Sequence, residues 1–246
     1  MKSKPANKIQ DLQFFGEFGG VNPSISDSST YTFLSANSMS ETFEGNMEGC
    51  YLYSRNSSPS NLYLEEACAA MEGTEAANVF SSGMGAITST ILQLCKSGDH
   101  IISSRTVYGG TYAFLKNFTP QLGIETSFVN ITSLDDIKKS IKPNTKIIYC
   151  EVSSNPLLEI ADLKLISKIA KKNNLKLIVD NTFTPLSITP AKHGADIVIH
   201  SLTKFINGTS DTIAGVVCSN KEFIHSLRDV NDGAFMLFGA TMDSLR

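Results

Sequence analysis

The sequence predicts an α/β fold built on a mostly parallel sheet. Short apolar runs rich in β-branched residues recur along the chain, and three of the clearest are 146–152, 175–179 and 197–199. Segments whose apolar residues have helical spacing separate these runs. Strand runs that alternate with helical segments in this way are typical of parallel sheets whose two faces are covered by helices.

The individual elements follow from the same two periodicities. Leu62, Leu64, Cys68 and Met71 have helical spacing, and Gly73 is a suitable stop for that helix. The spacing predicts further helices near 86–95, 112–118, 134–141 and 163–170. The apolar runs predict strands at 77–80, 99–103, 126–129, 146–152, 175–179, 197–199 and 212–218.

Residues 1–60 lack this regularity. They are rich in Ser and Asn, are interrupted by Gly and Pro, and contain the aromatic residues Phe14, Phe15, Phe18, Tyr31 and Phe33. A long segment without periodicity inside a globular chain is usually functional or a linker. The aromatic residues predict that it lies against another surface. We therefore divide the chain into an N-terminal arm, 1–60, and one large domain, 61–246.

The composition is that of an ordinary globular protein. Of the 246 residues, 41% are hydrophobic and 18% are charged, and the formal net charge is −3. This mild acidity argues against a nucleic-acid or anionic-membrane binder, because such binding depends on a basic field. No run approaches the ~18 apolar residues of a membrane span. The first residues contain no apolar core of a secretory signal, so we expect a cytoplasmic protein.

Several common kinds of site are disfavoured by spacing. The five cysteines are scattered without a C-x-x-C pair, and we expect idle thiols in a reducing compartment. The four histidines are not paired at i, i+4 beside a carboxylate, which disfavours a zinc site. No G-x-S-x-G hydrolase elbow occurs. The glycines after 77–80 lack the G-x-G-x-x-G form of a dinucleotide-binding turn.

Polar residues follow four of the predicted strands. The carboxyl ends of parallel strands meet at one rim of the sheet, where ligands collect. The four strands deliver to this rim Ser82-Gly83-Met84, Ser153-Ser154-Asn155-Pro156, Asp180-Asn181 and His200-Ser201-Leu202-Thr203-Lys204. We therefore expect these segments to form one site.

Lys204 directly follows a buried strand and two hydroxyl residues. In a partly dry pocket, desolvation lowers the pKa of a lysine, which then becomes a nucleophile for a carbonyl. A lysine in such a place commonly carries pyridoxal 5′-phosphate (PLP) as a Schiff base. PLP also needs a carboxylate for its ring nitrogen. Its phosphate needs backbone N–H groups at a helix N-terminus, and its ring needs a flat partner.

The sequence offers a candidate for each requirement. Asp180 is a carboxylate at a strand end, Tyr108 precedes two glycines and could stack on a ring, and Lys204 could bind the aldehyde. The candidates for the phosphate are Gly83, Met84, Ser201 and Thr203. Taken singly, each has an ordinary explanation, such as a helix cap or a solvent-facing lysine. One cofactor accounts for all of them together.

These segments resemble the PLP enzymes of cysteine and methionine metabolism, which include cystathionine synthases and lyases and methionine γ-lyase. The similarity runs from about Gly20 to the last residue. The matching segments are Tyr53-Ser54-Arg55 with Pro59 and Leu64-Glu65, Ser82-Gly83-Met84, Tyr108-Gly109-Gly110-Thr111, Glu151 to Pro156, Asp180-Asn181-Thr182, and His200-Ser201-Leu202-Thr203-Lys204-Phe205. The resemblance implies the large domain of an aspartate aminotransferase-like PLP-dependent transferase, with an irregular N-terminal arm.

The resemblance also implies roles for single residues. Lys204 would be the Schiff-base lysine and a proton shuttle. Tyr108 would stack on the cofactor ring and help move protons, and Asn155 would lie near the substrate and the ring oxygen. Asp180 would bind the pyridine nitrogen. The residues that would hold the phosphate are Gly83, Met84, Ser201 and Thr203.

The family further implies a homo-oligomer, a dimer of dimers. Tyr53 and Arg55 would cross a subunit interface to the neighbour's phosphate, where the guanidinium suits a charged oxygen pair. Family members continue into a C-terminal substrate domain, which we expect to be absent from this chain. No metal is expected. The small-molecule partner would be a sulfur amino acid, and no nucleic-acid or membrane partner is expected.

The activity implied is that of a C–S lyase of transsulfuration or methionine metabolism, similar to cystathionine γ-lyase or methionine γ-lyase. Two alternatives stay open. One is a γ-replacement synthase, such as cystathionine γ-synthase or an O-acyl-homoserine sulfhydrylase. The other is a truncated, catalytically weak cofactor-binding fragment. Gly110 stands where methionine γ-lyases typically carry a cysteine, so cystathionine γ-lyase-like or sulfhydrylase-like members fit at least as well.

Overall fold

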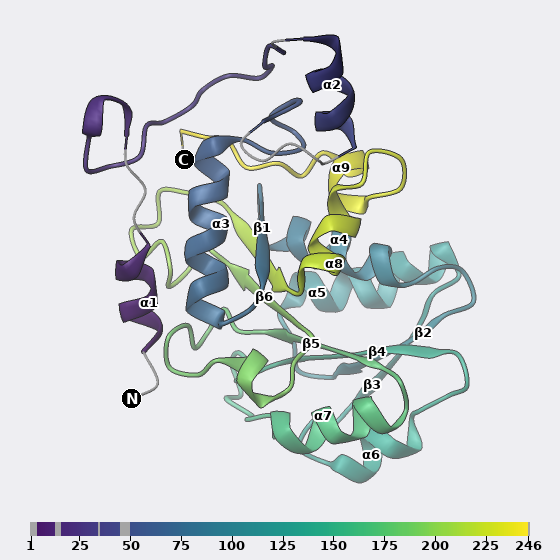
Figure 1. Cartoon of the computed structure of the whole chain (residues 1–246). Helices are drawn as coiled ribbons and strands as arrows, with labels where there is room; N and C mark the ends of the chain where they lie inside the picture. Colours follow the sequence, from purple (N-terminus) through teal and green to yellow (C-terminus); the bar gives the residue numbers. More distant parts are fainter. Residues whose placement is uncertain (1–3, 13–15, 34, 45–49, 246) are drawn as a thin grey trace.

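The apolar runs pair into one seven-stranded sheet, drawn in Figure 1 from a computed structural model that describes residues 4–12, 16–33, 35–44 and 50–245. The order of the strands across the sheet is β1-β7-β6-β5-β4-β2-β3. Their bounds are β1 (Ala76–Phe80), β2 (His100–Ser104), β3 (Glu125–Val129), β4 (Thr145–Glu151), β5 (Lys176–Asp180), β6 (Ile197–Ser201) and β7 (Gly215–Ser219).

The prediction of a mostly parallel sheet is confirmed. Strands β3, β2, β4, β5 and β6 pair in parallel, whereas β7 is antiparallel to both β1 and β6. Two reversals restore the direction of β1, so β7 alone runs the other way. The other strands therefore end at one rim, and β7 begins there.

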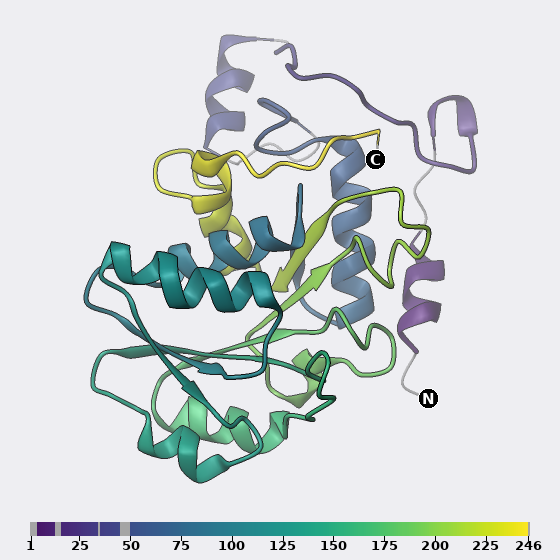
Figure 2. The same ribbon diagram turned by 180° about the vertical axis from the view of Figure 1, so that it is seen from behind.

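Helices cover both faces of the sheet (Figures 1 and 2). Side chains alternate along β4, so that Ile147 packs in the same core as Ile91 while Ile148 packs with Ile166 on the other face. One face carries α4 (Gly83–Leu94), α5 (Gly109–Ala113) with its π-helical continuation Phe114–Phe118, α8 (Lys221–Arg228) and α9 (Ala234–Phe238). The other face carries α3 (Pro59–Glu72), α6 (Leu134–Lys139) and α7 (Leu163–Lys172). Short 3₁₀ turns lie at Thr119–Leu122 and Pro190–His193.

Local signals explain where α3 begins and ends. The Ser58 hydroxyl accepts a hydrogen bond from the Asn61 N–H at 3.3 Å, and Pro59 follows as the first helical residue. Gly73 ends the helix with a φ of +69°, a conformation that favours glycine. The spacing did not predict α8, which buries only Ile224 and Leu227. Nor did it predict the short α9.

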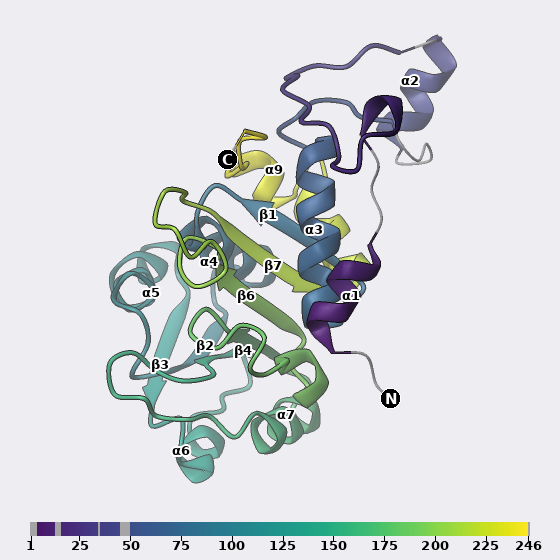
Figure 3. The same ribbon diagram turned by 90° about the vertical axis from the view of Figure 1, so that its left-hand side faces the viewer.

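The N-terminal arm is more regular than its sequence predicts. It contains α1 (Pro5–Asp11), a 3₁₀ turn (Glu17–Gly19) and α2 (Ala36–Phe43). The first of these helices packs beside α3 (Figure 3), and the second begins at a capping box formed by Ser35 and Ser38. Of the aromatic residues, Phe14 and Phe15 lie outside the described residues. The Tyr31 ring contacts that of Tyr51, whereas Phe18 is fully exposed, so the expectation that the aromatics are covered is wrong for Phe18.

None of the helices in the described ranges is long and apolar enough to cross a bilayer.

All five cysteines are free, and four of them are buried. Burial raises the pKa of the thiols of Cys68, Cys95 and Cys150 to about 12, which keeps them neutral and unreactive.

Gly215, the first residue of β7, sits directly beneath the turn that precedes α4. It pairs with Phe80 of β1 and with Ser201 of β6. A Cβ at this position would lie 2.3 Å from the Ser82 carbonyl oxygen and 2.8 Å from the Gly83 Cα. Only a glycine lets the reversed strand pass this close to that turn.

Replacing this glycine should therefore destabilise the fold. We expect Gly215→Ala to lower the free energy of unfolding by about 1–3 kcal/mol, because the clashing atoms belong to backbone that cannot move cheaply. Gly109→Ala is the matched control, since its Cβ would meet nothing within 4 Å. Urea unfolding of both variants tests this, and equal stabilities of Gly215→Ala and the wild type would contradict it.

Candidate active site

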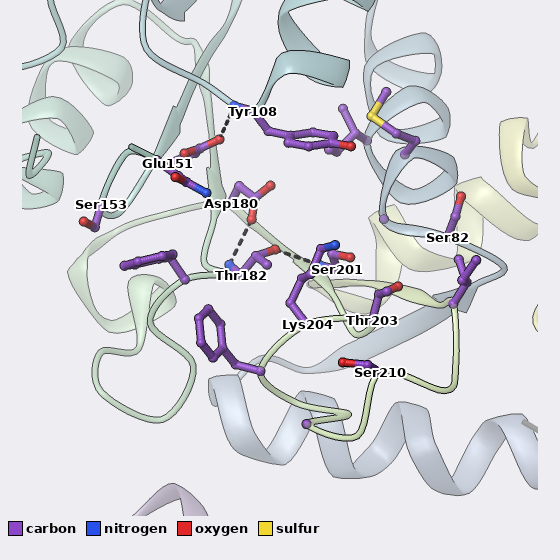
Figure 4. Close-up of a pocket in the computed structure, with 18 residues that line it drawn as sticks. Ser82, Tyr108, Glu151, Ser153, Asp180, Thr182, Ser201, Thr203, Lys204 and Ser210 are labelled. Carbon is purple, nitrogen blue, oxygen red and sulfur yellow. Dashed lines mark hydrogen bonds between the residues drawn. The ribbon is translucent and has the colours of Figure 1, made fainter. Parts of the chain in front are cut away.

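One cavity of about 980 Å³ opens at the carboxyl rim of the sheet (Figure 4). The ends of β4, β5 and β6, the start of α4 and the turn before α5 supply its walls. Eight of the ten predicted site residues line it: Gly83, Met84, Tyr108, Asn155, Asp180, Ser201, Thr203 and Lys204. Segments more than 100 residues apart are thus brought together by the parallel pairing of the strands.

Asp180 is the last residue of β5 and is buried at the base of the cavity. Its Oδ1 accepts a hydrogen bond from the Thr182 N–H at 2.9 Å, and its Oδ2 accepts one from the Tyr149 hydroxyl at 3.3 Å. The Tyr149 side chain is fully buried, and that burial raises its pKa well above the usual value, so it remains a donor. Asp180 is thereby held as a fixed acceptor beside the cavity.

Lys204 follows β6 by three residues and also lines the cavity. Its side chain is exposed. We expected this amine to lie in a partly dry pocket, and for Lys204 in this chain that expectation is wrong. The turn at 202–207 carries the lysine beyond the buried end of the strand. Lys204 nevertheless lines the same cavity as Asp180, because Asp180 and Ile199 are partners on the neighbouring strands β5 and β6.

The turn before α4 forms an anion cradle. Ser82 caps the 12-residue helix by accepting a hydrogen bond from the Gly85 N–H at 2.9 Å. The N–H groups of a first helical turn have no partner within the helix and favour an anion. A Cβ at Gly83 would lie 2.7 Å from the Ser201 Cβ, so only glycine lets the first turn of α4 approach Ser201 this closely. Gly83, Met84 and Ser201 all line the cavity, and the N–H donors of this turn fit a phosphate group there.

Thr203 differs from its expected role. Its hydroxyl donates to the Ala214 carbonyl oxygen at 3.1 Å and accepts from the Ala214 N–H at 3.0 Å. The hydroxyl proton is therefore engaged by backbone, and the side chain fixes the approach to β7. Ser201 is linked differently: its N–H donates to the Thr182 hydroxyl at 2.7 Å, which joins the ends of β5 and β6.

Glu151 is a site residue that the sequence analysis did not propose. It was quoted there only as the first residue of the motif from Glu151 to Pro156. It is the last residue of β4 and pairs with Asp180. Its Oε1 accepts a hydrogen bond from the Tyr108 N–H at 2.6 Å (Figure 4). Burial, and then the charge of Asp180, raise the pKa of Glu151 to about 7, against the lowering effect of hydrogen bonds from the Tyr108 and Asn155 N–H groups. Its position at a strand end was the signal that could have found it.

The ring of Tyr108 occupies the space over Gly110. A Cβ at 110 would lie 2.6 Å from the Tyr108 Cε1 and 3.0 Å from the Met84 Sδ. A side chain at 110 would therefore displace the ring. The cavity has further lining residues. Ser82, Ser153, Thr182 and Phe205 belong to segments quoted from the sequence, and those not singled out from the sequence are Ile87, Phe183, Gly208, Ser210 and Ile213. Within the described ranges, no cluster of three or more His, Cys, Asp or Glu residues could hold a metal ion.

The remaining two predicted residues, Tyr53 and Arg55, do not line this cavity. The Arg55 Nη1 donates to the Met236 carbonyl oxygen at 2.6 Å, and its guanidinium lies 5.6 Å from the centre of the Tyr53 ring. Tyr53 also forms an isolated β-bridge with Thr30. Within one chain, Arg55 therefore links the arm to α9, and the Tyr53 ring lies beside the Arg55 guanidinium.

Comparison with known proteins places these motifs in a family. The model of the Cys/Met metabolism PLP-dependent enzymes matches residues 8–244. The chain is 43% identical over 246 residues to a methionine gamma-lyase of Arabidopsis thaliana, covering 98% of this chain and 56% of that protein. It is 46% identical over 191 residues to a cystathionine gamma-lyase of Bacillus subtilis, covering 77% of this chain and 50% of that protein. The chain spans about half the length of the curated relatives it matches.

A solved structure agrees with the fold. It is a Campylobacter jejuni protein described as an O-acetylhomoserine (thiol)-lyase, and it carries N'-pyridoxyl-lysine-5'-monophosphate. Its TM-score is 0.89 at 26% identity, and the match covers 99% of this chain and 68% of that one. The expected PLP-dependent transferase fold is confirmed. The chain belongs to the family of Cys/Met metabolism PLP-dependent enzymes.

Proposed function

We propose that this chain is the cofactor-binding part of a PLP-dependent C–S lyase acting on a sulfur amino acid. The observation that carries the proposal is the presence of Lys204 and Asp180 in one cavity beside an anion cradle at the start of α4. The identities of 43% and 46% to a methionine gamma-lyase and a cystathionine gamma-lyase support the same reaction class.

The residues of the cavity fit PLP. When bound, this cofactor supplies an electron sink for the charge left on the substrate carbon. Lys204 would hold the aldehyde carbon through Nζ and, once displaced by the substrate amine, would carry the Cα proton. Asp180 would keep the ring nitrogen protonated. Tyr108 would cover the ring, and Asn155 would contact the ring oxygen.

The phosphate would be held by the first turn of α4. Gly83 and Met84 open that helix, and Ser201 lies against it at the close approach that Gly83 allows. Thr203 would contribute chiefly by fixing the approach to β7, because its hydroxyl is already bonded to Ala214. A negative group at this end of the helix is favoured by the helix dipole as well as by the free N–H groups.

A γ-replacement synthase is the second candidate. The observation that favours it is the likeness in fold to the O-acetylhomoserine (thiol)-lyase. Both reactions begin with removal of the Cα proton, for which Lys204 is the candidate in either case. γ-Elimination needs a second deprotonation at Cβ, whereas β-elimination does not. A third candidate is a cofactor-binding unit with weak turnover. The chain spans about half the length of its curated relatives.

We also propose a homo-oligomer, a dimer of dimers, in which Tyr53 and Arg55 reach the neighbour's phosphate. Neither residue lines the cavity of its own chain, and both are exposed.

We propose a cytoplasmic location, which the five free cysteines support.

The link to Lys204 can be tested by absorbance. The protein incubated with PLP and freed of excess should show the visible band of the lysine-bound cofactor, and Lys204→Ala should lose it. Lys171→Ala, an exposed lysine on α7, is the control and should keep the band. A band that survives in Lys204→Ala would contradict the assignment.

The ionisation of Glu151 can be tested by stability. Its pKa in the folded protein is about 7, above its ordinary value of about 4.5, so it favours folding at low pH and loses that contribution as the pH rises from about 4.5 to 7. The loss should be on the order of 2–3 kcal/mol. Urea unfolding between pH 4.5 and 8 should show this decline in the wild type relative to Glu151→Gln. Parallel curves for the two proteins would contradict it.

Product analysis separates the reaction classes. The lyase proposal predicts that the holoenzyme releases a 2-oxo acid from cystathionine or methionine. The synthase alternative predicts a thioether product from an O-acyl-homoserine with sulfide or cysteine and little release from cystathionine. Running a chain extended to the length of the relatives beside this one tests the third candidate, which predicts PLP binding by both and turnover only by the longer one.

A further inference from the structure

A buried carboxylate lies behind the cavity and is not one of its lining residues. Glu72 is the last residue of α3 and is 1% exposed. Its Oε1 accepts a hydrogen bond from the His200 Nε2 at 2.7 Å and another from the Asn181 Nδ2 at 2.9 Å. Because a carboxylate only accepts, the imidazole nitrogen that faces it carries the proton. Burial of a carboxylate is costly unless it is paired in this way.

Both partners of Glu72 belong to the segments that form the cavity. Asn181 lies between Asp180 and Thr182, and His200 immediately precedes Ser201. The two segments are also joined directly. The Asn181 N–H donates to the Ile199 carbonyl oxygen at 2.8 Å. The carboxylate therefore spans the ends of β5 and β6 from the face opposite α4.

Further hydrogen bonds fix the side chain of Asn181. Its Nδ2 also donates to the Ile188 carbonyl oxygen at 3.1 Å, and its Oδ1 accepts from the Thr184 hydroxyl at 2.7 Å. The side chain thus holds the loop that follows β5, which carries Phe183 into the cavity wall. A shift of Glu72 would be passed through Asn181 to this loop and to Asp180.

We propose that Glu72 is a positioning residue, whose buried carboxylate sets the relative placement of Asp180 and Lys204 through Asn181 and His200. The inference rests on the proposed function, because it takes those two groups to bind PLP. Two side chains that bind one ligand from different strands must keep their relative positions to within about half an ångström. Buried neighbours that hydrogen-bond to those segments provide this accuracy.

The chain offers a matched control on the same helix. Glu65 is also buried in α3, at 4% exposure. Its Oε1 also has two partners: it accepts a hydrogen bond from the Val79 N–H at 3.1 Å and forms an ion pair with Arg228. In both residues the second oxygen, Oε2, has no partner among the described residues. Glu65 differs in that its partners lie on β1 and α8, away from the cavity-lining residues.

The test compares Glu72→Gln with Glu65→Gln. Each substitution removes a buried charge and leaves an amide NH₂ where no acceptor is present. We expect Glu72→Gln to weaken PLP binding about tenfold and to change the visible circular dichroism of the bound cofactor, which reports how the ring is held. Glu65→Gln should bind PLP within about twofold of the wild type, although its unfolding midpoint falls.

The outcomes separate the possibilities. Equal PLP affinities of Glu72→Gln and the wild type, or equal losses in the two variants, would overturn the positioning role. If Glu72→Gln does not fold, His200→Leu removes one of the two links and must then weaken PLP binding, while Glu65→Gln does not. A wild-type chain that binds no PLP would overturn the proposed function instead, and that result is read before any variant is compared.

Discussion

The in-register parallel pairing of β4, β5 and β6 is the constraint on which the site depends. It sets Glu151 beside Asp180 and Asp180 beside Ile199, so that three carboxyl ends reach one rim. The side-chain period of a strand is two, so a slip of one residue would turn Asp180 from the cavity to the opposite face. The apolar residues that fill both faces prevent such a slip, because Ile178 and Val179 would exchange cores. The same register therefore buries the apolar side chains on both faces of the sheet and places Asp180 at the cavity.

The reversed strand β7 completes this arrangement. It begins at the rim where its neighbours end, and Gly215 lets it pass under the turn that opens α4. That turn is in close contact with Ser201 through Gly83. The cradle for an anion and the lysine segment are thus packed against each other where the Gly83 backbone meets Ser201. From the opposite face, Glu72 ties the same strand ends to α3.

Much of this could be predicted from the sequence, and the failures have physical causes. Alternating periodicities predicted the sheet, and the rule that ligands collect at carboxyl ends brought seven of the eight cavity-lining site residues together. The eighth, Tyr108, was proposed from its place before two glycines. Periodicity does not encode strand direction, so the reversal of β7 was missed. The exposure of Lys204 and the bonds of Thr203 depend on how a turn leaves its strand, which apolar spacing does not report. Glu72 looked like an ordinary helix residue, because its partners lie more than 100 residues away.

The chain belongs to a PLP-dependent family and spans about half the length of its curated relatives, so the covalent chemistry of Lys204 is the central claim. Reduction of the PLP-loaded protein with borohydride, followed by mass spectrometry of its peptides, tests that claim most directly. We expect one added pyridoxyl phosphate group per chain, on the peptide that contains Lys204. Labelling spread over other lysines, or an unlabelled Lys204 peptide, would contradict it.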